Sequence, residues 1–300
     1  MMFRGKLSRS FRWLGITLII SGLLANTAYA RDKPQTVDEA LMAIESVDGF
    51  PQAIGPMIDA AKQHVAVVEN VDASKPAALL GEAAKPAFDP ATWRDNILAK
   101  IASPSTGSSV DADAFIKASQ NLVESYGKAA ELFQKDNKAS TDSIADRLKS
   151  RPDNADLEAL VSSMALPDMA AETTTTTMAM TKAIEIFFNE DPAQFAKLTT
   201  ADIDGLVATY FQKFNVDNED IKPQADLVRQ SKKIAVEYAL SELSQEDIKI
   251  LLDFYKSDSG QAKREALIKA FNEQLLQSNK IMLKSYFVEV SAYFRSKAQQ

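Results

Sequence analysis

The stretch LSQEDIKILLDFYKSDSGQ, residues 243–261, sets the fold class of this chain. Its apolar residues recur with the spacing i, i+3, i+4 and i+7, which places them on one face of a helix. They are Ile248, Leu251, Leu252 and Tyr255. Ser244 is placed to cap this helix, which is expected to end near Lys256. Asp258 then begins a second helix as its N-cap, with Gln261 as reciprocal partner, so the stretch predicts two helices joined by a tight corner.

A glycine and an aromatic pair define the expected corner. Gly260 falls in the first turn of the second helix, where the missing Cβ atom lets another backbone approach closely. Phe254 and Tyr255 precede the corner and are expected to fill it. The first interpretation of the stretch is therefore architectural.

The same stretch resembles the signature of domain of unknown function 2059, a family of bacterial, mostly exported, helical proteins. The family pattern is an acidic S/T-x-E-E/D start followed by F-Y-x-S-x-x-G, and the resemblance covers about residues 225–285. The matching positions are Phe254, Tyr255, Ser257, Gly260 and Gln261. Asp258 departs from the pattern, in which a small residue or proline is expected. The resemblance implies an exported helical domain without an established activity, and it does not extend to residues 31–190.

Helix signals recur along the rest of the chain, whereas strand-like alternation is almost missing. Thr36 to Glu39 is a capping box, and Asp89-Pro90 and Asp191-Pro192 each place a capping carboxylate before a proline at the first helical position. We expect helices at roughly 37–48, 51–70, 90–102, 111–135, 141–149, 154–165, 170–189, 192–197, 201–214, 223–242, 245–256 and 259–297. The sequence therefore predicts an all-α multi-helix bundle.

The helices are expected to form two regions after a leader at residues 1–30. An Ala-rich N-terminal helical region covers 31–150, and a C-terminal helical domain covers 151–300 and contains the motif at 243–261. Aromatic residues gather from Phe187 onward. Because large apolar side chains supply most of the burial energy, the C-terminal domain should hold the firmer core.

A spacing of 45 residues relates two parts of the C-terminal domain. Leu198-Thr199, Asp202-Ile203, Leu206 and Tyr210 recur as Leu243-Ser244, Asp247-Ile248, Leu251 and Tyr255. Helical-hairpin repeats have periods of this order, but any two capped amphipathic helices share such a pattern. Degenerate repeats and a chance likeness both stay open.

The first thirty residues have the pattern of a cleaved signal peptide. Four cations, Arg4, Lys6, Arg9 and Arg12, precede an apolar run from Leu14 to Leu24. Ala28-Tyr29-Ala30 is a small-x-small cleavage site. The run is shorter than the roughly 20 residues that span a bilayer, so we expect cleavage after Ala30 rather than an uncleaved anchor. A periplasmic location fits best, with secretion as the alternative.

The charge of the chain limits its partners. The formal net charge is −7, and removal of the four leader cations makes it −11. An acidic chain is a poor match for phosphate backbones and for anionic lipid head groups, so nucleic acid is not expected as a partner. No later segment resembles a membrane span. No cysteine is present, so the fold relies on no disulfide.

Few residues could carry catalysis. His64 is the only histidine, and without cysteines beside it the common zinc arrangements are excluded. We expect neither a metal nor a cofactor. Acid pairs at Glu219-Asp220 and Glu246-Asp247 keep one enzymatic alternative open, a hydrolase acting on an envelope polymer. Such chemistry uses two carboxyl groups on opposite sides of a cleft.

The last helix is the feature that indicates binding. From Ile281 to Phe294 it is apolar on nearly every side, and such a helix is either buried in a large core or covered by a partner or a second copy. We therefore expect a non-enzymatic exported protein that binds an envelope protein or an apolar small molecule. The expected binding residues lie on this helix and beside the corner: Phe254, Tyr255, Ser257, Gly260, Gln261, Tyr286, Phe287 and Phe294.

Overall fold

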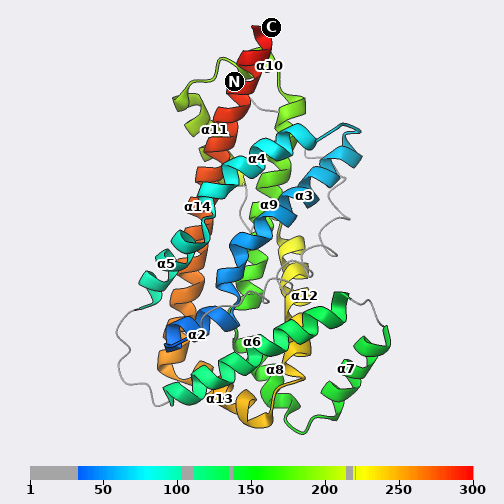
Figure 1. Ribbon diagram of the computed structural model, residues 1–300, viewed down its shortest axis with the longest axis vertical. Helices are drawn as coiled ribbons and strands as arrows, with labels where there is room; N and C mark the ends of the chain where they lie inside the picture. Colours follow the sequence, from blue (N-terminus) through cyan, green and yellow to red (C-terminus); the bar gives the residue numbers. More distant parts are fainter. Residues whose placement is uncertain (1–32, 103–110, 135–137, 214–218, 220, 300) are drawn as a thin grey trace.

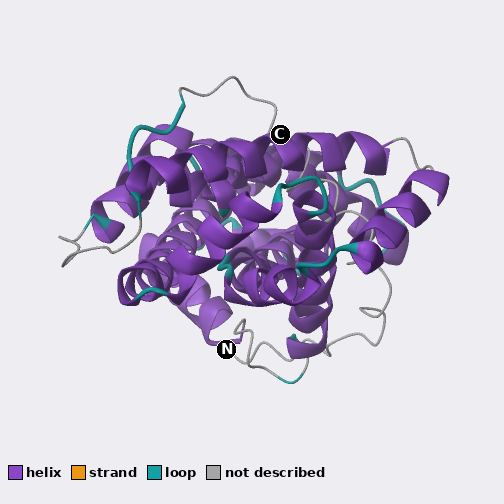
Figure 2. Cartoon of the chain, turned by 90° about the horizontal axis from the view of Figure 1, so that it is seen from below, coloured by secondary structure: helices purple, strands orange, loops and turns teal. Residues whose placement is uncertain are grey.

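The computed structural model describes residues 33–102, 111–134, 138–213, 219 and 221–299, which form helices and loops without a strand (Figure 2). The helices are α2 (Val37–Ile44), η3 (Val47–Gly49), α3 (Phe50–Val68), α4 (Ser74–Ala87), α5 (Pro90–Ile101), α6 (Ala112–Gln134), α7 (Lys138–Ser150), α8 (Asn154–Ser163), α9 (Leu166–Asn189), α10 (Pro192–Phe195), α11 (Thr200–Lys213), α12 (Lys222–Leu240), α13 (Gln245–Lys256) and α14 (Asp258–Ala298). The prediction of an all-α multi-helix bundle is confirmed. The predicted leader and its cleavage point lie outside the described residues.

Helix α14 runs along nearly the whole long axis of the molecule, with α9 beside it (Figure 1). Helices α4 and α5 pack against α14, and α3 and α12 pack against α9. At one end, α6 contacts α2, α12 and α13, while α10 and α11 contact α14 at the other end. Within the described ranges, no helix is both long enough and apolar enough to cross a membrane.

Helix α4 is absent from the sequence prediction, which is wrong at this point. Pro76, Gly81 and Pro86 all lower the helix propensity of this segment. Pro76 is nevertheless tolerated because it lies in the first turn, where backbone N–H groups have no partner within the helix. Leu80 is fully buried, and α4 makes one of the most extensive helix contacts in the molecule, with α14. Tertiary packing therefore outweighs the local propensity.

The buried apolar side chains form one continuous core that includes both predicted regions. Phe50, Phe88 and Trp93 cluster with Phe271 of α14 at ring-centroid separations of 5.1 to 6.0 Å. The Trp93 indole N–H donates to the Val47 carbonyl at 3.0 Å. These three aromatic side chains of the N-terminal region thus join the last helix in one cluster, and the boundary near residue 150 stays a prediction.

The two segments related by 45 residues both begin a helix with the same kind of cap. In α11, Asp202 N donates to Thr199 Oγ1 at 3.2 Å, and in α13, Asp247 N donates to Ser244 Oγ at 3.0 Å. The shared cap accounts for the matching Thr/Ser and Asp positions of the two sequences, and a true duplication stays a prediction.

Candidate functional site

The corner between α13 and α14 is built around Ser257. Its Oγ accepts a hydrogen bond from Gly260 N (3.0 Å) and donates one to the Phe254 carbonyl (2.7 Å). Ser257 is therefore the N-cap of α14. The prediction that Asp258 caps this helix is wrong by one residue, because Asp258 is already its first residue. Gln261 Nε2 donates to the last carbonyl of α13 (3.3 Å), so it helps close the corner instead of pairing with Asp258.

The corner leaves no room for a side chain at Gly260. A Cβ atom at this position would lie 1.8 Å from the Phe254 carbonyl oxygen. The end of α13 and the start of α14 therefore meet so closely that only glycine fits without a shift. The close backbone approach predicted at Gly260 is confirmed.

Tyr255 leads from the corner to a buried carboxyl group, that of Glu45. Glu45 follows α2 and is 0% exposed. Its carboxyl oxygens accept hydrogen bonds from the backbone N–H groups of Ala165 (2.9 Å) and Leu166 (2.5 Å) and from the Tyr255 hydroxyl group. The two N–H groups belong to the start of α9, whose positive dipole end favours a carboxylate. Glu45 thus joins α2, α9 and α13.

The surroundings of Glu45 set its protonation. Burial raises the pKa of Glu45 to about 7, against its three hydrogen bonds and the Arg264 guanidinium, which lower it. Arg264 donates to the Ser163 carbonyl and to Asp168, both at 2.6 Å. The Tyr126 hydroxyl group is buried without a hydrogen-bond partner among the described residues, and burial together with the Glu45 charge raises its pKa. Glu45, Tyr126 and Tyr255 are all buried, so this part of the cluster joins helices inside the core.

Replacing Glu45 with glutamine should remove a pH dependence from the free energy of unfolding. A carboxyl group whose pKa rises from 4.5 to about 7 on folding stabilises the fold below pH 4.5 and loses that contribution as the pH rises through 7. The loss amounts to about 3 kcal/mol. Urea unfolding between pH 4.5 and about 8 should show the wild type weakening relative to Glu45→Gln by this amount. A difference that stays constant over this range would contradict a raised pKa.

Tyr286, Phe287 and Phe294 hold other helices to α14. Tyr286 donates to a backbone carbonyl of α9 at 2.9 Å, and Phe287 packs against Tyr210 of α11 with ring centroids 5.7 Å apart. Tyr286 and Phe287 are both 0% exposed. Phe294 is half-buried and lies 5.0 Å, between ring centroids, from Phe187 of α9. Tyr286 and Phe287 face the bundle, whereas Ile281, Lys284 and Val288 of the same helix are exposed.

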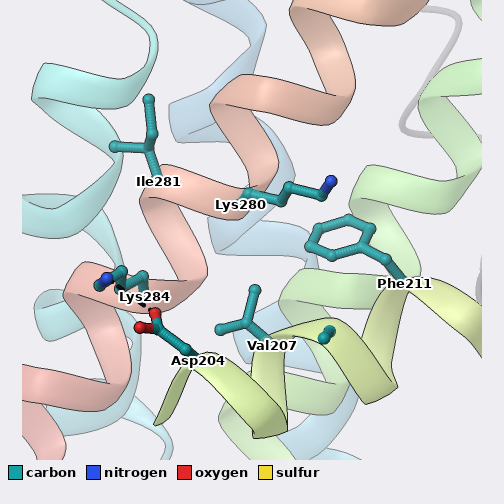
Figure 3. A pocket seen from close by; sticks show the side chains of 7 residues that line it. Asp204, Val207, Phe211, Lys280, Ile281 and Lys284 are labelled. Atoms are coloured by element: carbon teal, nitrogen blue, oxygen red, sulfur yellow. Dashed lines mark ion pairs between the residues drawn. The ribbon is translucent and has the colours of Figure 1, made fainter. Parts of the chain in front are cut away.

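An open groove lies between α11 and α14, on the side of α14 that solvent reaches (Figure 3). Its volume is about 530 Å³. Val207 and Phe211 of α11 and Ile281 of α14 provide its apolar surface. Ile281 is 42% exposed, which makes it one of the few large apolar side chains of α14 that remain open to water.

Charged side chains stand at the edges of this groove. Lys280 Nζ lies 5.9 Å from the centre of the Phe211 ring. Lys284 Nζ pairs with Asp204 of α11 at 2.7 Å, as the dashed line in Figure 3 shows. The groove therefore combines an apolar surface with two cations and one carboxylate.

His64, the only histidine, lies on α3 and is 7% exposed. Burial lowers the pKa of His64, while Glu185 raises it and Lys182 lowers it further. Within the described part of the chain, no group of three His, Asp or Glu side chains is placed to hold a metal ion.

The residues of the two acid pairs that the structure describes do not line the groove. Asp247 accepts hydrogen bonds from Ser244 (2.7 Å) and Asn121 (3.1 Å), so it belongs to the cap of α13. Glu219 is exposed, and Asp220 lies outside the described residues. The hydrolase alternative stays a prediction of the sequence.

Sequence reasoning missed two buried charged residues. Glu45 gives no local signal, because its partners Ala165 and Tyr255 lie 120 and 210 residues away. Lys232 does give a local sequence signal, because it stands four residues from both Val228 and Val236 on the buried face of α12. Lys232 is 4% exposed, and its Nζ has no hydrogen-bond partner among the described residues. Burial lowers its pKa to about 7.

Comparison of the chain with protein-family models gave no match, and searches of curated proteins and of solved structures gave no significant match. The resemblance to domain of unknown function 2059 over about residues 225–285 therefore stays a prediction from the motif itself.

Proposed function

We propose that this protein is a non-enzymatic helical protein of the bacterial cell envelope that binds a partner protein in the groove between α11 and α14. The observation that carries the proposal is the exposure of Ile281, which lines this groove, on a helix that buries most of its large apolar side chains. Ile281 and Val288 are 42% and 41% exposed, whereas Tyr286 and Phe287 between them are fully buried. Apolar surface of this kind, bordered by charged residues, is typical of interaction sites.

The shape of the groove supports a protein segment as its occupant. Sites for small molecules enclose most of the ligand surface. This groove is open along the side of the bundle, and two neighbouring helices offer a trough in which a third helix can bury one apolar face. An apolar small molecule is the alternative occupant.

The cellular location that we propose for this protein rests on the sequence of residues 1–30. The cations, apolar run and small-x-small site within residues 1–30 support export through a cleaved signal peptide. The periplasm is the compartment that we propose, with secretion as the alternative.

Replacing Ile281 with aspartate should break the complex while leaving the fold intact. A carboxylate at this exposed position is tolerated in the free protein, but a partner that covers it would have to bury an unpaired charge. Native mass spectrometry of residues 31–300 recovered from the periplasm should show the wild type with an added protein mass. The complexed fraction should fall at least about tenfold in Ile281→Asp.

Val67→Asp is the matched control for this experiment. Val67 is 78% exposed on α3, away from the groove residues, so this variant should keep its complex. Equal complexes in both variants would contradict the groove as the binding site. An added mass of lipid size, lost in Ile281→Asp, would favour the apolar small molecule instead.

A further inference from the structure

The exposed side of α14 carries a stripe of cations and aliphatic residues. Its members recur at intervals of one, three and four residues, so they lie along one side of the helix. They are Lys280, Ile281, Lys284, Val288, Ala292 and Arg295, all of them exposed. Glu289 is half-buried and falls about 100° around the helix from Val288. Between residues 280 and 295 the stripe therefore carries no carboxylate; Glu273, two turns before Lys280, is paired with Lys100 at 2.7 Å.

The charge of this stripe is positive, whereas the net charge of the whole chain is negative. The chain has a formal net charge of −7, yet the stripe carries three cations, of which one, Lys284, is paired with Asp204. Lys280 contacts the Phe211 ring and makes no ion pair within the described residues. The stripe and the groove beside it thus form a local basic and apolar surface on an acidic protein.

Resting on the function proposed above, we propose that the occupant of this surface is an acidic amphipathic helix of a partner protein. The apolar face of such a helix lies against Val207, Phe211 and Ile281, and its flanking carboxylates approach Lys280, because Lys284 is already paired with Asp204. Complementary charge at the edge of an apolar groove fixes the orientation of the partner and speeds its association.

An anionic membrane surface shares part of this chemistry, and the remaining charge of the chain argues against it. The groove edge carries Asp204 as well as two lysines, and the chain as a whole is repelled by a surface of its own sign. A single helix can place its carboxylates over Lys280 and away from Asp204, whereas a continuous anionic surface cannot.

The test uses residues 31–300 and two synthetic peptides of about 18 residues, long enough for five helical turns. Both carry leucines at i, i+3, i+4 and i+7; glutamates flank the leucines in one peptide and lysines in the other. The wild type should bind the glutamate-flanked peptide in a fluorescence anisotropy titration. Lys280→Glu should weaken that binding about tenfold and should strengthen binding of the lysine-flanked peptide by a similar factor.

Three outcomes overturn the inference. The wild type binds both peptides equally, or Lys280→Glu leaves the preference between the two peptides unchanged, or the wild type binds phosphatidylglycerol vesicles and Lys280→Glu abolishes that binding. If neither peptide binds while Ile281→Asp still loses its periplasmic complex, the acidic helix is wrong and the proposed function stands. If Ile281→Asp keeps its complex, the proposed function itself fails.

Discussion

Replacing Lys232 with methionine should raise the free energy of unfolding at pH 7 by up to about 5 kcal/mol. The lysine stands on the buried face of α12, and its Nζ has no hydrogen-bond partner among the described residues. Burial lowers its pKa from 10.5 to about 7, and each pH unit corresponds to about 1.4 kcal/mol. Methionine has a similar length and packs without a polar partner, so the variant removes this cost.

The gain from Lys232→Met depends on pH in a defined direction. Above pH 10.5 the lysine is neutral in the folded and unfolded chains, so the variant gains nothing from charge. As the pH falls from 10.5 to 7, the unfolded chain takes up a proton that the folded chain does not, and the gain becomes complete below pH 7. Urea unfolding at pH 7 and at about 10 measures this difference.

The neighbouring Lys233, which is half-buried, provides the control. Lys233→Met should change the free energy of unfolding by no more than about 0.5 kcal/mol at either pH. A loss of stability in Lys232→Met at pH 7 would contradict an unpaired buried ammonium group.

Replacing Gly260 with alanine should lower the free energy of unfolding by about 3 kcal/mol, the upper end of the cost of overpacking. The added Cβ atom would lie 1.8 Å from the Phe254 carbonyl oxygen, which belongs to the backbone and cannot rotate away. The corner would have to open, which disturbs the Ser257 cap and the neighbouring Tyr255 that reaches Glu45. Urea unfolding followed by circular dichroism measures the loss.

Gly205→Ala in α11 is the matched control. Gly205 is exposed, and a Cβ atom there would have nothing within 4 Å. This variant should gain about 0.5–1 kcal/mol from helix propensity. If Gly260→Ala were as stable as the wild type, the close contact at the corner would be wrong.

The local features of the fold could be predicted from the sequence. The face formed by Ile248, Leu251 and Leu252 sets α13, and the Ser244 cap sets its start, because both depend on residues a few positions apart. The predicted start of α14 is wrong by one residue, because Ser257 and Asp258 are both good capping residues and the sequence does not show which of them caps the helix.

Features that depend on distant segments could not be predicted. The burial of Phe287 follows from α10 and α11, which cover it, and not from its own helix. The same packing leaves Ile281 exposed, although the sequence is apolar at both positions. The groove therefore becomes visible only once α11 lies beside α14, and the sequence indicates a binding helix without showing which side binds.

The most direct test of the account is a photocrosslink from the groove in living cells. Benzoylphenylalanine in place of Ile281 should give a discrete protein adduct on irradiation, because this side chain lies within the proposed interface. The same photoreactive residue in place of Val67, which is more exposed, should give none. Adducts of equal yield from both positions, or none from position 281, would contradict partner binding in the groove between α11 and α14.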